Sequence, residues 1–169
     1  MKREVLFGGN PVSVLGDEIK VGDKADNFKA LNLDLSEFDF YKDTEGKVKI
    51  ISVAPSIDTP VCSLQATFFN AEATQLSDDV VIVTITVDLP FAQKRYCGAN
   101  GIDNIQVVSD HRNLDFGNKY GFVMDKIRLL ARGIVVVDKD NQVQYVEYVH
   151  NISDEVDYEG AIKAVKALL

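Results

Sequence analysis

The chain has 169 residues, of which 46% are hydrophobic and 26% are charged. This length is enough for one well-buried core and too short for two comfortable domains, so we expect a single domain over residues 1–169. Eighteen Lys and Arg against 26 Asp and Glu give a net charge of -8, which argues against binding to nucleic acid or to anionic membranes. Small molecules or proteins are therefore the expected partners.

The N-terminus, Met1-Lys2-Arg3-Glu4, has no apolar stretch after its basic pair, and no apolar run approaches the roughly 20 residues that span a bilayer. We expect a cytoplasmic protein, although a mature form whose signal had been removed would have the same sequence. Two cysteines are too few for a disulfide-rich scaffold or for a zinc site made of thiolates. In a reducing compartment such a pair is more often catalytic or inert than structural.

The first predicted elements in chain order are short antiparallel strands. Residues 4–7 and 12–15 flank the turn-forming sequence Gly8-Gly9-Asn10-Pro11, which predicts a β-hairpin within about residues 1–18. A second turn is predicted at residues 43–46. Residues 48–53 form the next strand, which stops at Pro55 because proline lacks the N–H that a sheet ladder needs.

A helix is predicted over residues 62–76, after a loop over residues 55–61, with Leu64, Phe68 and Ala71 on one face. Residues 80–87 are a continuous β-branched run, typical of a strand buried on both faces. A strand, a helix and a second buried strand of these lengths predict a right-handed crossover with parallel pairing.

The second half of the chain adds further elements of both kinds. Residues 90–96 indicate a helix leading to Cys97, and residues 113–120 a shorter helix that ends at Gly121. Residues 133–137 and 142–149 predict a hairpin, and residues 158–168 a last helix with apolar residues at helical spacing. This order predicts an α/β, thioredoxin-like fold with a central mixed sheet, flanking helices and the N-terminal hairpin.

Cys62 is the first candidate for chemistry, because the predicted fold puts it after the first central strand, at the start of a helix. Reactive groups in open α/β sheets collect at this edge. Unpaired N–H groups and the positive end of the helix dipole both favour a thiolate there. Thiolate formation gains only about thirtyfold in rate, so other groups must also stabilise the transition state. Thr59 offers a hydroxyl three residues earlier, and Pro55 and Pro60 stiffen the loop.

Residues 55–62, Pro-Ser-Ile-Asp-Thr-Pro-Val-Cys, match the P-x-x-x-T-x-x-C signature of the peroxiredoxins. Residues 52–65 and 88–99 resemble the bacterial thiol peroxidase subfamily, whose members are atypical two-cysteine peroxiredoxins. Further similarity at residues 9–12, 109–112 and 129–132 extends this resemblance over nearly the whole chain. One departure is Asp26, where members of the subfamily usually have a proline, and we expect it to affect only local chain stiffness.

The resemblance implies a thiol-specific peroxidase of antioxidant defence that reduces hydrogen peroxide and alkyl or lipid hydroperoxides to water and alcohols. Cys62 matches the peroxidatic cysteine, which is oxidised to sulfenic acid, and Cys97 the resolving cysteine, which forms a disulfide with it. Thr59 and Arg132 match the pair that binds the peroxide oxygens, and Pro55 the proline that shields the site. A homodimer recycled by thioredoxin, without cofactor or metal, is also implied.

If Cys97 lies on a helix of its own, closure of the disulfide should require local unfolding. Structural interpretations of the same residues stay open at this stage. Cys62 has the alternative of a buried structural thiol, and Cys97 that of an unreactive thiol at the surface or in the core. Thr59 has the alternative of a turn or N-cap residue, and Arg132 that of a solvated charge at a strand entrance.

Other residues are given structural interpretations. His111 and His150 are isolated from any ligand set, which argues against a metal site and against a Cys-His hydrolase. We expect the side chains of Arg95, Arg112 and Arg128 at the surface. We expect Phe68 and Phe69 in the core, and the alternative for them is a substrate pocket. A peroxide sensor or chaperone-like protein is the competing function; a disulfide oxidoreductase is disfavoured because no C-x-x-C motif exists.

Overall fold

The computed structural model describes residues 3–169, and the strands within this range form two sheets. The larger sheet has seven strands in the order β11-β10-β5-β6-β7-β3-β4, and the smaller has four in the order β1-β2-β8-β9. The strands are β1 (Arg3–Phe7), β2 (Asn10–Val14), β3 (Lys29–Leu31), β4 (Glu37–Asp39), β5 (Val48–Val53), β6 (Val80–Thr86), β7 (Gln106–Ser109), β8 (Val123–Met124), β9 (Leu129–Leu130), β10 (Gly133–Val137) and β11 (Val143–Tyr148). The helices are α1 (Phe40–Asp43), α2 (Pro60–Ala73), α3 (Pro90–Asn100), α4 (Asp115–Tyr120) and α5 (Tyr158–Lys166).

The centre of the larger sheet is parallel. β5 pairs with β6 and β6 with β7 in parallel, and α2 and α3 supply the crossovers that parallel neighbours require. β10 pairs with β5 and β11 with β10 in antiparallel orientation, so the sheet is mixed. These findings confirm the predicted α/β class, mixed central sheet and flanking helices.

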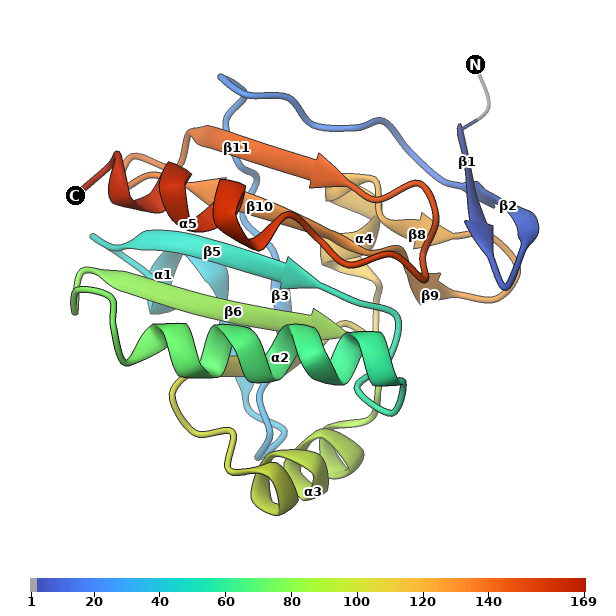
Figure 1. Ribbon diagram of the computed structural model, residues 1–169, viewed down its shortest axis with the longest axis horizontal. Helices are drawn as coiled ribbons and strands as arrows, with labels where there is room; N and C mark the ends of the chain where they lie inside the picture. The colour runs from blue at the N-terminus through green and yellow to red at the C-terminus, as the bar shows by residue number, and fades with distance from the viewer. Residues whose placement is uncertain (1–2) are drawn as a thin grey trace.

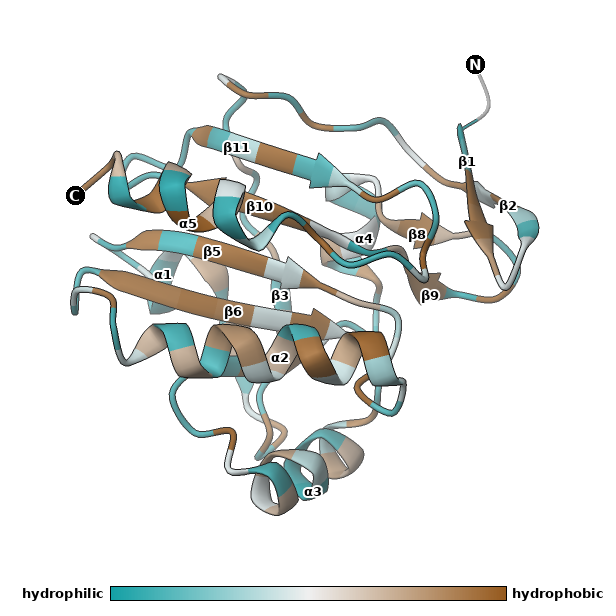
Figure 2. Cartoon of the chain, in the orientation of Figure 1, coloured by the Kyte–Doolittle hydropathy of each residue, from teal (hydrophilic) through white to brown (hydrophobic). Residues whose placement is uncertain are grey.

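Helices cover both faces of the larger sheet, α2 and α5 on one side and α1 and α4 on the other (Figure 1). On the α2 and α5 side, Phe69 and Ile162 pack against residues of the central strands, including Ile82. On the other side, Phe28 and Phe116 belong to a second core cluster. All six residues of β5 are consequently buried, and apolar residues run along β5 and β6 (Figure 2).

The predicted N-terminal hairpin is present as β1 and β2. Its turn is shorter than expected, because Gly8 and Gly9 alone, with φ of 59° and 82°, reverse the chain, and Asn10 and Pro11 belong to β2. β2 pairs with β8, and β8 with β9, which ends two residues before Arg132. The smaller sheet therefore fixes the chain just ahead of Arg132. Residues 1 and 2 of the predicted hairpin region lie outside the described residues.

The helix that carries Cys62 differs from the prediction in both its start and its buried face. α2 begins at Pro60, because proline is well suited to the first position of a helix, and it ends at Ala73. Leu64 is 55% exposed, so the face on which Leu64, Phe68 and Ala71 were predicted is not the face that α2 buries. The side chains that α2 buries are those of Cys62, Gln65, Ala66 and Phe69. A polar residue belongs to the buried face, which a hydrophobic pattern cannot indicate.

The other predicted elements are present with shifted ends. β5, β6, the β10–β11 hairpin, α4 with Gly121 at its end, and α5 all lie where the pattern indicated. α3 extends to Asn100, so Cys97 does lie on a helix of its own. The sequence pattern did not indicate β7, β8 or β9, which have four, two and two residues and are too short to display a period.

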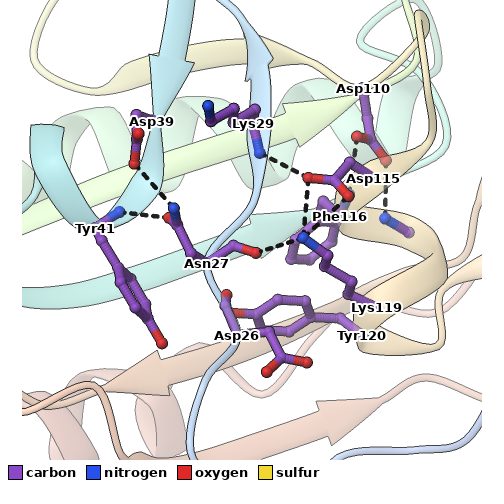
Figure 3. Close-up of polar contacts among 11 residues, drawn as sticks. Asp26, Asn27, Lys29, Asp39, Tyr41, Asp110, Asp115, Phe116, Lys119 and Tyr120 are labelled. Atoms are coloured by element: carbon purple, nitrogen blue, oxygen red, sulfur yellow. Dashed lines mark hydrogen bonds and ion pairs between the residues drawn. The ribbon is translucent and has the colours of Figure 1, made fainter.

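The segment around Asp26, which departs from the subfamily pattern, lies beside α1 and α4 (Figure 3). The Tyr120 hydroxyl donates to the Asp26 carbonyl at 2.6 Å, and Lys119 Nζ donates to the Asn27 carbonyl at 2.9 Å. The Asn27 side-chain oxygen accepts the Tyr41 N–H at 2.8 Å. Groups of both helices therefore hold this segment, on the face of the sheet opposite α2.

Candidate active site

Cys62 lies in the first turn of α2, which begins at the carboxyl end of β5 (Figure 1). The chain leaves β5, passes through the loop of residues 54–59, and enters the helix at Pro60, with Thr59 as the N-cap residue in an extended conformation. The first turn carries no acidic side chain. The positive end of the helix dipole is therefore not neutralised from within the helix, which favours a negatively charged sulfur.

Arg132 brings a positive charge directly to this sulfur. The Arg132 Nη2 donates to Cys62 Sγ at 3.2 Å, and each of the two residues is only 2% exposed. The guanidinium is fixed on its other sides, because Nη1 donates to Gln65 Oε1 at 2.8 Å and Nε donates to the Ile152 carbonyl at 2.8 Å. A planar group held by three partners needs no reorganisation when charge develops on the sulfur.

The charge of Arg132 has no acidic partner. Among residues 3–169, none of the salt bridges involves Arg132, and its described acceptors are a carbonyl, an amide and the Cys62 sulfur. A buried charge without a counterion is costly. A thiolate at Cys62 would supply that counterion.

Gln65 is a residue of this site to which sequence reasoning assigned no role. It is 1% exposed, and its Nε2 donates to Ser52 Oγ at 2.7 Å and to the Val53 carbonyl at 3.2 Å. Its oxygen is thereby aimed at Arg132. The signal in the sequence was its spacing, because residues three apart on a helix lie on the same face, and Gln65 follows Cys62 by three.

Thr59 and Pro55 lie in the loop before α2. Pro55 is buried, whereas Thr59 is exposed at the helix start. The Thr59 hydroxyl donates to the Ser56 carbonyl at 3.0 Å, and within residues 3–169 it makes no hydrogen bond to the Cys62 sulfur. The structure thus brings together Cys62 and Arg132, and leaves the Thr59 hydroxyl engaged within the loop, on the solvent side of the site.

Cys97 is separated from Cys62 by its own packing. It lies on α3 and is 7% exposed, in a small cluster with Ile102 and Val107. Burial raises the pKa of the Cys97 thiol, so the neutral form is favoured while α3 stays folded. Both cysteines are free thiols in this structure.

An apolar hollow of about 660 Å³ adjoins α2 and α5, lined in part by Phe68, Tyr158 and Ile162. The Phe68 and Tyr158 rings are 4.2 Å apart, while Phe69 is fully buried in the core. Burial and the Glu155 charge raise the pKa of Tyr158. The hollow therefore lies along α2, the helix that carries Cys62, and Phe68 follows Cys62 by six residues.

The remaining charged candidates stay outside the site. The side chains of Arg95, Arg112 and Arg128 are exposed, as predicted. His111 is half-buried and His150 is exposed. Over residues 3–169, no cluster of His, Cys, Asp and Glu has an arrangement that could hold a metal ion, and no helix is both long and apolar enough to span a bilayer.

Comparison with known proteins finds similarity along nearly the whole chain. A family model described as Redoxin matches residues 20–162. A thiol peroxidase of Halalkalibacterium halodurans is 50% identical over 165 residues, which cover 98% of each chain. A thiol peroxidase of Bacillus subtilis is 49% identical over 166 residues, again 98% of each. Among solved structures, a peroxiredoxin-like protein from Aquifex aeolicus has a TM-score of 0.91 at 36% identity, covering 99% of this chain and 98% of that one. The predicted thioredoxin-like fold is thereby confirmed.

Proposed function

The chain belongs to the thiol peroxidases of the Redoxin family, enzymes that act as peroxidases, and we propose that Cys62 is the residue that attacks the hydroperoxide. The observation that carries this proposal is the contact of Arg132 with Cys62, at 3.2 Å, between two buried groups. A guanidinium without an acidic partner favours a thiolate, and the thiolate is the form of cysteine that acts as a nucleophile. We further propose that residues 1–169 act as one domain.

In the first step the Cys62 thiolate donates an electron pair to the terminal oxygen of the hydroperoxide. The oxygen–oxygen bond breaks, the alkoxide or hydroxide leaves and takes a proton from solvent, and the hydroxyl stays on sulfur as sulfenic acid. Arg132 offsets the negative charge as it spreads from sulfur to the two oxygens. Thr59 can turn its hydroxyl from the Ser56 carbonyl toward the bound peroxide, because only one hydrogen bond holds it.

In the second step Cys97 resolves the sulfenic acid. Its thiol condenses with Cys62, releasing water and forming the intramolecular disulfide, and an external dithiol then reduces this disulfide by thiol–disulfide exchange. We propose thioredoxin as that dithiol, a homodimer as the working form, and the cytoplasm as the location.

Organic hydroperoxides, alkyl or lipid, are proposed as substrates beside hydrogen peroxide. The apolar hollow at Phe68, Tyr158 and Ile162 supports this choice, because an alkyl chain could bury apolar surface there, on the helix that carries Cys62. Pro55, buried in the loop before α2, would keep water from the thiolate.

The test is hydroperoxide consumption driven by thioredoxin, thioredoxin reductase and NADPH. The wild type should turn over many times, Cys62→Ser should be inactive, and Cys97→Ser should reduce about one equivalent per chain and then stop. Full turnover by Cys62→Ser would refute the assignment. Oxidation of the wild type once per chain without recycling would favour a peroxide sensor instead.

A further inference from the structure

Polar contacts made by two residues, Asp88 and Tyr96, join the segment that carries Cys62 to the segment that carries Cys97. We propose that Asp88 and Tyr96 are positioning residues that hold these segments together in the reduced protein and thereby limit the rate of disulfide closure. We call the contacts of Asp88 with Ser56 and Ile57, together with that of Tyr96 with Ser63, the polar bridge. The inference rests on the proposed function, since it concerns the step that joins Cys97 to Cys62.

Asp88 ties down the loop before α2. Its carboxylate accepts the Ser56 hydroxyl at 2.7 Å and the Ile57 N–H at 2.9 Å. Its second oxygen also accepts the Thr86 hydroxyl at 2.7 Å. Asp88 itself stands two residues before Pro90, the first residue of α3. One carboxylate thus connects the loop that shapes the Cys62 site to the start of the helix that carries Cys97.

Tyr96 makes the second connection, from helix to helix. Its hydroxyl lies 2.6 Å from Ser63 Oγ and 3.3 Å from the Ser63 carbonyl oxygen. Ser63 follows Cys62 directly on α2, and Tyr96 directly precedes Cys97 on α3. A hydrogen bond between the immediate neighbours of both cysteines restrains the two backbones that must move during closure.

Closure requires at least one cysteine to leave its present packing, because each sulfur is buried among neighbours of its own. Cys97 is in the third turn of α3 and packs against Ile102 and Val107, whereas Cys62 is buried beside Arg132. A disulfide needs the two Cα atoms within about 7 Å and the Cβ atoms directed at each other. At least one segment must therefore unfold locally, and the polar bridge opposes that opening.

The polar bridge then acts in opposite directions on the two steps. It keeps the loop and α2 ordered, which serves the attack on peroxide, and it delays the arrival of Cys97 at the sulfenic acid. While the sulfenic acid waits, a second peroxide can oxidise it to sulfinic acid. Loss of the bridge should accelerate closure and lower the yield of sulfinic acid. Loss of a residue that served stability alone would not both accelerate closure and lower the yield of sulfinic acid.

The experiment compares Tyr96→Phe and Asp88→Asn with controls of the same chemistry. Tyr41→Phe removes a half-buried phenol that donates to the Ala25 carbonyl, away from both cysteines. Asp138→Asn changes a carboxylate that, like Asp88, accepts three hydrogen bonds, from the Asp140 and Gln142 N–H groups and the Gln144 amide. Each reduced protein is mixed with cumene hydroperoxide and quenched at set times, and mass spectrometry counts sulfenic acid, disulfide and sulfinic acid.

We expect Tyr96→Phe to close the disulfide about fivefold faster than the wild type, the effect of one net hydrogen bond, with the oxidation of Cys62 within about twofold. Asp88→Asn should also close faster, and should oxidise Cys62 more slowly because its loop is looser. Both should yield less sulfinic acid in excess peroxide, and both controls should match the wild type.

Closure by Tyr96→Phe at or below the wild-type rate would overturn the inference, whatever the folding of Asp88→Asn, because loss of one hydroxyl creates no cavity. Acceleration by the controls to the same degree would also overturn it. A wild-type protein that forms no disulfide between Cys62 and Cys97 would instead remove the proposed resolving step. The two failures are thus distinguishable.

Discussion

Replacement of Gln65 by leucine tests whether the geometry of Arg132 matters beyond its charge. Leucine keeps most of the volume of Gln65 but removes the acceptor for Arg132 Nη1 and the donors to Ser52 Oγ and the Val53 carbonyl. Arg132 keeps its charge and its bond to the Ile152 carbonyl. The variant therefore loosens the guanidinium without removing it.

The magnitude follows from the bonds that are lost. A hydrogen bond to a charged group contributes about 1.5–3 kcal/mol, and at about 1.36 kcal/mol per tenfold in rate this corresponds to about 10- to 100-fold slower oxidation of Cys62. Because the buried partners Ser52 and Val53 lose their donors, the free energy of unfolding should also fall, by about 2–4 kcal/mol. Stopped-flow mixing with cumene hydroperoxide gives the rate, and urea denaturation gives the stability.

Lys49→Met is the control for stability. Lys49 lies on β5, the strand that also carries Ser52 and Val53. It is 1% exposed, and its Nζ donates to the Asp138 carbonyl at 3.2 Å and to Asn141 Oδ1 at 2.7 Å. Its loss should destabilise the fold without changing Cys62 oxidation. If Gln65→Leu were destabilised like the control yet oxidised at the wild-type rate, Gln65 would be structural only and the positioning argument would fail.

Three further predictions concern Arg132, Asp110 and Gly133. Arg132→Met should slow Cys62 oxidation about 10²- to 10³-fold in stopped flow. Arg132→Lys should recover only part of the lost rate, because lysine lacks the planar fork of the guanidinium. An Arg132→Met rate equal to that of the wild type would contradict the charge argument. Burial raises the pKa of Asp110 (Figure 3) to about 7, above the value of the unfolded chain, so the folded protein holds this proton and loses stability as pH rises from about 4 to 7. The free energy of unfolding of the wild type, measured by urea denaturation relative to Asp110→Asn, should therefore fall by up to about 1.4 kcal/mol per pH unit in that window. A difference between the two proteins that does not change with pH would contradict this prediction. In Gly133→Ala the new methyl group would collide with the Glu147 carbonyl of β11, so the free energy of unfolding in urea should fall by about 1–3 kcal/mol. Oxidation of Cys62 should also slow, because Gly133 follows Arg132. A variant as stable as the wild type would contradict this prediction.

The framework of this fold could be read from the sequence wherever a local pattern determines the structure. β5 and β6 are recognisable because their apolar runs are long enough to be buried on both faces. The start of α2 was misplaced by two residues, since the prediction treated Pro60 as part of the loop although proline favours a first helical turn. The exposure of Leu64 could not be foreseen, because the face that α2 buries depends on which neighbours satisfy Gln65.

The candidate site was predicted in part. Cys62 follows from its place after a central strand and Thr59 from its place three residues earlier, whereas the roles of Arg132 and Cys97 came from the family resemblance. The contacts that fix the guanidinium join residues far apart in the chain, such as Gln65 and Ile152, and no local pattern encodes such pairs. The same holds for the Asp88 and Tyr96 contacts, which depend on how α3 packs beside α2.

The most direct test of the account is the identification of the oxidised atom. Reduced Cys97→Ser protein, mixed with one equivalent of cumene hydroperoxide and trapped with dimedone, is digested and analysed by mass spectrometry. We predict one adduct per chain, on the peptide that contains Cys62, and its formation about 10²-fold or more slower when Arg132→Met is added. An adduct on another residue, or an equal rate without Arg132, would contradict the central claim that a thiolate at Cys62, paired with this guanidinium, cleaves the peroxide.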